Sequence, residues 1–95
     1  MSKGLSKTQR VILGLIDGTE SVQMNHWDEW KATTNQLLLE LEDRDMIDGS
    51  RPWRQHQSSM RRACDSLSRR GLIEGWYVLS DHHRRTLSWR IPTFA

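Results

Sequence analysis

The sequence predicts one α+β domain with three to four helices and a C-terminal two-stranded β-hairpin. The chain has 95 residues, which is the length of a single domain. Apolar residues recur at helical spacing in several segments before residue 71, and two strand-like runs flank a polar turn after it. The expected elements within the single domain 1–95 are helix 6–17, helix 34–45, helix 57–70 and hairpin 72–91, with a short helix over 26–32 left open.

The first helix is marked at both ends. Ser6 and Gln9 have the spacing of a capping box, in which each side chain accepts a hydrogen bond from the other residue's backbone N–H. Gly18 is a natural helix stop. Between these signals one apolar face is formed by Val11, Ile12, Leu15 and Ile16.

The segment 18–33 allows more than one interpretation. Trp27 and Trp30 would share a face if Asn25 or His26 began a short helix over 26–32. The favoured interpretation is that the two rings cover one edge of the core. A stacking platform for bases is the alternative, disfavoured because the acidic residues at 28 and 29 would repel phosphate.

A second capping box, Thr33 with Gln36, begins the helix expected over 34–45. Its inward stripe is Leu37, Leu38 and Leu41, and its predicted outer face is acidic, with Glu40, Glu42, Asp43 and Asp45. We expect this acidic face to meet solvent, a partner protein or basic side chains of the same chain.

The third helix is expected over 57–70, capped by Ser58 or Gln57 and ended by Gly71. Its inward stripe is Met60, Ala63, Cys64 and Leu67. The loop before it would be long, about residues 46–56, and would carry Arg51, Trp53, Arg54 and His56.

The predicted hairpin has a strand from Leu72 to Leu79, a polar turn over 80–85 and a second strand that Pro92 stops. In that second strand the alternation places Leu87, Trp89 and Ile91 on one side and Thr86, Ser88 and Arg90 on the other.

Charge is distributed unevenly along the chain. Residues 1–48 carry five basic and nine acidic side chains, a net charge of −4, and residues 49–95 carry nine arginines and three acidic residues, a net charge of +6. Arginine suits bidentate contact with phosphate and guanine, so the split suggests a polyanionic partner for the second half. The alternative is that the two halves neutralise each other on a solvated surface.

The stretch 58–74, SSMRRACDSLSRRGLIE, resembles the recognition helix of MarR-like bacterial regulators, which are winged helix-turn-helix proteins. The matching positions are the polar pair Ser58-Ser59, the apolar Met60, the family arginine at Arg62, the anchor Leu67 and the exit 69–73. The resemblance is close over 58–91 and only outlines the earlier helices. It implies a winged-helix fold and double-stranded DNA as partner, with a role as a small transcriptional regulator.

In this interpretation the helix 57–70 enters the major groove, and the turn of the hairpin reaches the adjacent minor groove or backbone. The residues expected to contact DNA are Arg54, Ser58, Ser59, Arg61, Arg62, His82, His83, Arg84 and Arg85. Asp65 could instead hold Arg61 or Arg69. A protein-interaction module that uses the acidic helix 34–45 is the alternative function.

Other functional classes, such as enzymes and metal-binding proteins, have little support in the sequence. The four histidines and Cys64 lack a metal-ligand spacing, no catalytic residue set can be assembled, and no cofactor motif is present, so we expect neither an enzyme nor a metal or cofactor site. Cys64 is expected to be a buried apolar residue. The sequence has no apolar run that could span a membrane and no secretory signal, which favours a cytoplasmic protein. Homodimerisation is considered because a lone winged helix makes a small DNA interface.

Overall fold

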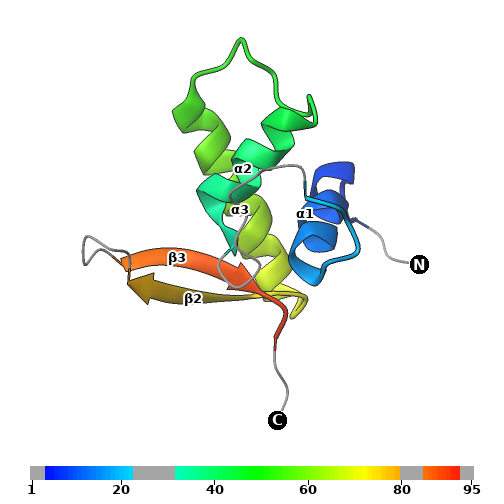
Figure 1. Cartoon of the computed structure of the whole chain (residues 1–95), viewed down its shortest axis with the longest axis vertical. Coiled ribbons are helices and arrows are strands. Elements are labelled where there is room, and N and C mark those ends of the chain that lie inside the picture. Colours follow the sequence, from blue (N-terminus) through cyan, green and yellow to red (C-terminus); the bar gives the residue numbers. More distant parts are fainter. Residues whose placement is uncertain (1–3, 23–31, 80–84, 93–95) are drawn as a thin grey trace.

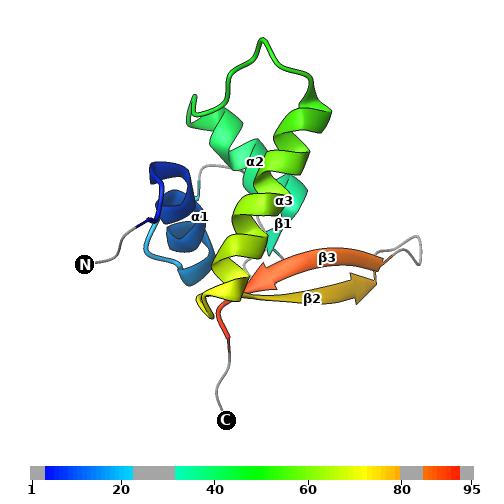
Figure 2. The same ribbon diagram turned by 180° about the vertical axis from the view of Figure 1, so that it is seen from behind.

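The computed structural model describes residues 4–22, 32–79 and 85–92. In chain order the elements are α1 (Lys7–Asp17), β1 (Ala32–Thr33), α2 (Thr34–Asp43), α3 (Trp53–Arg69), β2 (Glu74–Leu79) and β3 (Arg85–Arg90). The α+β class is therefore confirmed. In Figures 1 and 2 the helices gather together, and the β2–β3 hairpin projects sideways from the end of α3, away from α1.

The three strands form one antiparallel sheet in the order β1-β3-β2. The hairpin register pairs Glu74 with Arg90 and Leu79 with Arg85, and the short β1 pairs Ala32 with Trp89 on the other side of β3. Strand β1 was not predicted from the sequence. Its residue Ala32 falls within the range 26–32 proposed for a short helix, so the helix assignment is wrong at Ala32. The rest of that range, residues 26–31 with both tryptophans, lies outside the described residues.

Both predicted capping boxes are confirmed. The Ser6 hydroxyl accepts from the Gln9 backbone and the Gln9 side chain accepts from the Ser6 backbone, and Thr33 and Gln36 repeat this arrangement. Helix α1 ends at Gly18, whose φ of 85° is left-handed, as predicted. Helix α2 ends at Asp43, two residues before the predicted end.

The end of α2 has an unusual residue in a common motif. Asp45 has a φ of 58°, the backbone N–H of Asp45 donates to the Glu42 carbonyl, and that of Met46 donates to the Leu41 carbonyl. These two bonds form a Schellman motif with aspartate where glycine is usual. Gly71, with a φ of 75°, has the same role after α3.

The third helix begins four residues earlier than predicted. Pro52 is the N-cap residue of α3 and makes no side-chain capping bond, so the expected caps at Ser58 and Gln57 are wrong. The physical reason is that proline fixes its own φ near the helical value and needs no N–H donor at a helix start. Trp53 and His56, assigned to a loop by the sequence, extend the helix by one turn.

The core lies between the helices and the inner side of the sheet. It includes the predicted leucines of α2, the predicted stripe of α3 and Trp89, and its buried members are Ile12, Leu15, Ala32, Leu37, Leu38, Leu41, Met60, Cys64, Leu67, Ile73 and Trp89. Within β3 the alternation does not decide burial. Ser88 is buried although it lies on the opposite side from Trp89, because β3 is the central strand with neighbours on both sides, and Ile91 is 39% exposed because it lies beyond the paired segment.

Candidate nucleic-acid interface

The side of α3 that faces away from the core is open along its length (Figure 2). With successive residues 100° apart, the stripe Met60, Cys64 and Leu67 leaves the opposite side of the helix to polar residues. The exposed residues on this side include Arg54, Gln55, Ser58, Arg61, Arg62 and Arg69. The partly exposed Asp65 lies among them, so the open side of α3 is mainly but not entirely basic.

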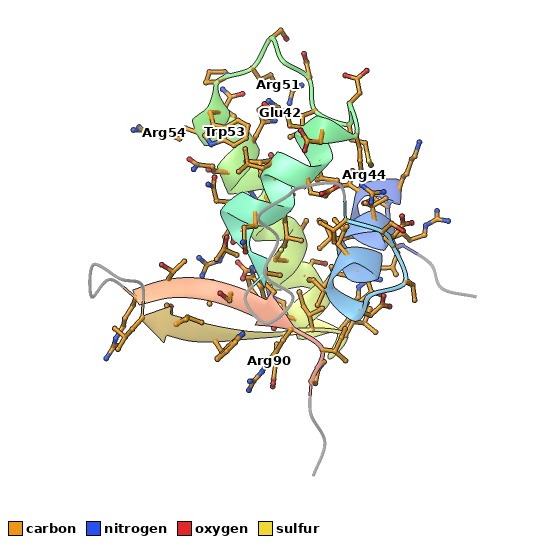
Figure 3. The ribbon with its side chains drawn as sticks, viewed as in Figure 1. Glu42, Arg44, Arg51, Trp53, Arg54 and Arg90 are labelled. Carbon is orange, nitrogen blue, oxygen red and sulfur yellow. The ribbon has the colours of Figure 1, made fainter. Side chains whose placement is uncertain are left out.

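A hollow of about 640 Å³ lies at the start of this open side. Its lining residues are Arg51, Pro52, Arg54, Gln55, Ser58, Ser59 and Arg62, and none of them is acidic. The first turn of α3 adds unpaired backbone N–H groups and a partial positive charge. In Figure 3 the labelled Arg54 projects outward from this end of the molecule. The structure thus brings the predicted residues Arg54, Ser58, Ser59 and Arg62 together in one concave, electropositive surface.

The arginines differ in whether a carboxylate neutralises them. Arg51 lies 3.7 Å from Asp48, Arg61 lies 3.3 Å from Asp65, and Arg90 lies 2.6 Å from Glu74. Within residues 4–22, 32–79 and 85–92, no ion pair involves Arg54, Arg62, Arg69 or Arg85. Their charge therefore remains available to an external anion.

Arg61 has a different position from Arg62, its neighbour in the sequence. Its guanidinium donates to the Asp65 carboxylate and lies 6.0 Å from the centre of the Trp89 ring, on the hairpin side of α3. The expected pairing of Asp65 with an arginine is confirmed for Arg61. Because 100° separates adjacent residues on a helix, Arg62 lies over the hollow while Arg61 is held toward the sheet.

The connection before α3 has its own turn, which brings Arg51 to the rim of the hollow. The Asp48 carboxylate accepts hydrogen bonds from the Ser50 backbone (2.9 Å) and hydroxyl (2.6 Å), and the Asp48 carbonyl lies 2.7 Å from His56 Nε2. The bonds from Ser50 hold the pKa of Asp48 below its usual value, with a smaller contribution from Arg51. The connection is thus tied to the first turn of α3.

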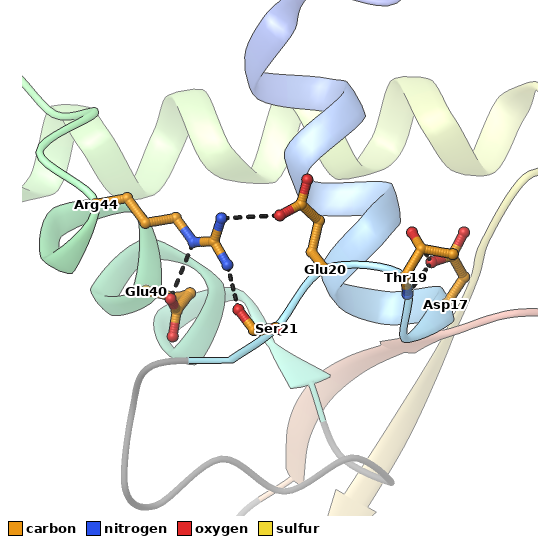
Figure 4. Close-up of polar contacts among 6 residues, drawn as sticks. All are labelled: Asp17, Thr19, Glu20, Ser21, Glu40 and Arg44. Atoms are coloured by element: carbon orange, nitrogen blue, oxygen red, sulfur yellow. Dashed lines mark hydrogen bonds and ion pairs between the residues drawn. The ribbon is translucent and has the colours of Figure 1, made fainter.

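The acidic face predicted for α2 is only partly correct. Glu40 is fully buried, and its carboxylate accepts from Arg44 Nε at 3.0 Å. Arg44 also contacts the Glu20 carboxylate at 3.0 Å and the Ser21 carbonyl, so it joins the end of α2 to the segment after α1 (Figure 4). Burial opposes the charge of Arg44, but the hydrogen bonds and charges of Glu40 and Glu20 raise its pKa overall. Glu42, Asp43 and Asp45 remain exposed.

Three of the expected DNA contacts, His82, His83 and Arg84, lie outside the described residues, and Arg85 is exposed at the start of β3.

Cys64 is buried as expected, and burial raises the pKa of its thiol to about 12. Among the described residues, no group of three or more His, Cys, Asp or Glu side chains could hold a metal ion. No helix in the described part of the chain is long and apolar enough to cross a membrane.

Arg54 was expected in a loop, but it lies in the first turn of α3. The signal that could have located it is Pro52, since proline is favoured at the start of a helix.

Comparison of the chain with family models, with curated proteins and with solved structures found no match.

Proposed function

We propose that this chain is a winged helix-turn-helix module that binds double-stranded DNA and acts as a small transcriptional regulator. The element order α1, β1, α2, α3, β2, β3 and the sheet order β1-β3-β2 support this fold. The observation that carries the functional proposal is the set of exposed arginines on the open side of α3, next to the hairpin, that form no ion pair with another described residue. A helix with one open basic side has the width and charge to enter the major groove.

Within this proposal the α3 arginines have separate roles. Arg54 and Arg62 are about 80° apart around the helix and border the same hollow, so both would reach the DNA without breaking an ion pair to any described carboxylate. Ser58 lies between them and would donate to a phosphate or a base edge. Arg61, held by Asp65, would supply charge near the hairpin and would contribute less to direct contact.

The hairpin would act as the wing. Arg85 is exposed where β3 begins and would contact the backbone or the minor groove beside the major groove that α3 occupies. His82, His83 and Arg84, which precede it in the sequence and lie outside the described residues, are proposed to extend that contact.

A protein-interaction module is the second candidate. The exposed carboxylates of Glu42, Asp43 and Asp45 at the end of α2 favour it, because they form an acidic surface that would repel DNA and attract a basic partner. The burial of Glu40 with Arg44 weakens this candidate, since one of the expected acidic residues has a structural partner.

Fluorescence anisotropy of a labelled random DNA duplex at about 50 mM and about 200 mM salt tests the main proposal. Wild-type protein should bind at low salt and weaken at least tenfold at high salt. The double variant Arg54→Ala/Arg62→Ala should bind more weakly and reduce the slope of log affinity against log salt by about two, one for each lost phosphate contact.

Lys7→Ala/Arg10→Ala is the matched control, because it removes the same charge from exposed positions on α1. Circular dichroism of each variant checks that it is folded. The proposal fails if wild-type protein does not bind duplex DNA at low salt. The assignment of the surface to α3 fails if the α1 variant loses as much affinity as the α3 variant.

A further inference from the structure

Strand β2 is at the edge of the sheet. The order β1-β3-β2 places β3 in the centre, so within the described residues β2 pairs on one side only, over six residues from Glu74 to Leu79. Its other side presents backbone N–H and C=O groups that an additional antiparallel strand could pair with.

This edge lacks the usual protection against strand pairing. Exposed edges in monomeric proteins commonly carry charged residues, proline or a bulge. The segment 75–79, Gly-Trp-Tyr-Val-Leu, has no charge and no proline, and its pairing with β3 is continuous. Tyr77 is 63% exposed and Leu79 is 67% exposed, both on the same face of the strand. An apolar strand edge of this kind favours a protein strand as its partner.

We propose that a second copy of this chain pairs its β2 antiparallel to this one, around a two-fold axis at Tyr77, and so joins two sheets into one. The inference goes beyond DNA binding and does not rest on it. It assigns the interface of the expected homodimer to the free edge of β2.

The register follows from symmetry. Around a two-fold axis perpendicular to the sheet, opposite residues must lie on the same face, so the axis must pass beside a residue rather than between two. An axis at Tyr77 places the two Tyr77 side chains opposite each other and pairs the whole uncharged segment 75–79 with itself. An axis at Trp76 would also pair five strand residues, but it would place the charged Glu74 opposite Val78 and leave the exposed Leu79 without a strand residue opposite it. An axis at Val78 would pair only three strand residues.

Apolar contact also favours the axis at Tyr77. There, Leu79 of one copy lies opposite Gly75 of the other, where the Trp89 and Leu87 side chains of that chain cover the glycine, so the exposed leucine would pack beside apolar atoms. On the other face Trp76 lies beside the second copy's Val78. The strand is therefore complementary to itself, which distinguishes a second copy from an arbitrary partner strand. The small interface predicts a weak dimer with a dissociation constant in the micromolar range.

A disulfide experiment tests the register. In Tyr77→Cys the two Cα atoms would be about 4.5–5.5 Å apart, within the range that a disulfide spans. In Leu79→Cys the equivalent atoms would be about 13 Å apart along the strands, which is too far. After mild oxidation, Tyr77→Cys should run as a covalent dimer on a non-reducing gel and Leu79→Cys should run as a monomer. Native Cys64 is buried and should not compete. If neither variant is cross-linked, or both are to the same extent, the proposed register is wrong.

Sedimentation equilibrium without DNA tests the dimer itself. The average mass of the wild-type chain should rise from 11.2 kDa toward twice that value as the concentration passes through the micromolar range. Tyr77→Lys should remain at the monomer mass, and Ile91→Lys, a control that places the same charge at an exposed apolar position outside the strand, should still dimerise. A wild-type chain that stays monomeric at about 500 µM overturns the inference. Since no DNA is present, this outcome leaves the DNA-binding proposal untouched.

Discussion

Arg44 provides the sharpest test of how this fold is held together. Its side chain is 15% exposed, and it joins the fully buried Glu40 carboxylate of α2 to Glu20 and the Ser21 carbonyl after α1 (Figure 4). Arg44→Met keeps much of the side-chain volume but removes the guanidinium group that contacts the buried Glu40 carboxylate. Removing one member of a buried ion pair typically lowers the free energy of unfolding by about 3–5 kcal/mol.

This loss is large for a chain of 95 residues, whose total free energy of unfolding is about 5–14 kcal/mol. A loss of about 3 kcal/mol should lower Tm by about 12–24 °C. Urea and thermal unfolding followed by circular dichroism would measure both quantities. The matched control is Arg90→Met, which breaks an ion pair whose side chains are 43% and 37% exposed, and it should cost no more than about 1 kcal/mol.

A second variant tests the ion pair as a unit. Glu40→Met/Arg44→Met removes both members and should recover most of the stability that Arg44→Met loses, because the buried carboxylate is removed together with the guanidinium group that contacts it. If Arg44→Met costs as little as Arg90→Met, or if the double variant is less stable than Arg44→Met, the structural role assigned to this contact is wrong.

Three further predictions concern other parts of the fold. Asp45→Gly should raise the free energy of unfolding and Gly71→Ala should lower it, each by about 1 kcal/mol, because both positions have left-handed backbone. If urea unfolding shows that both variants change the free energy of unfolding in the same direction, this reasoning is wrong. Cys64, whose pKa burial raises to about 12, should react with Ellman's reagent only as fast as the protein unfolds, and rapid labelling of folded protein would contradict its burial. Ser50→Ala should shift the NMR-measured pKa of Asp48 upward toward its ordinary value. Because the folded pKa of Asp48 is depressed, the stability that wild type gains over Ser50→Ala should be present at neutral pH and disappear as pH falls through that pKa; a difference independent of pH would exclude this role.

Much of the local structure was predictable because its signals are short-range. The capping boxes at Ser6 and Thr33, the stop at Gly71 and the inward leucines of α2 depend on residues three or four positions apart, and the structure confirms them. The two hairpin strands also followed from alternation and a polar turn, although β2 begins at Glu74 rather than Leu72.

The errors occur where tertiary contacts decide. Strand β1 has only two residues and is identifiable only through its pairing with β3. Glu40 was placed on the outer face of its helix, where solvent, a partner protein or basic side chains of the same chain were all expected as contacts. The structure shows that a basic side chain, Arg44, contacts it, and nothing local reveals which of the three applies. Likewise, the candidate arginines of α3 were found from the sequence, but the ion pair of Arg61 and the lack of one for Arg54 and Arg62 among the described residues required the structure.

We propose that α3 and the hairpin form the surface that binds DNA, and a titration of ¹⁵N-labelled protein with a short duplex, followed by amide chemical shifts at low salt, would locate that surface. We expect the perturbed amides to lie at 51–69 and in the hairpin strands, with the exposed acidic end of α2 unchanged. Perturbations centred on Glu42, Asp43 and Asp45, or no perturbation at all, would contradict it.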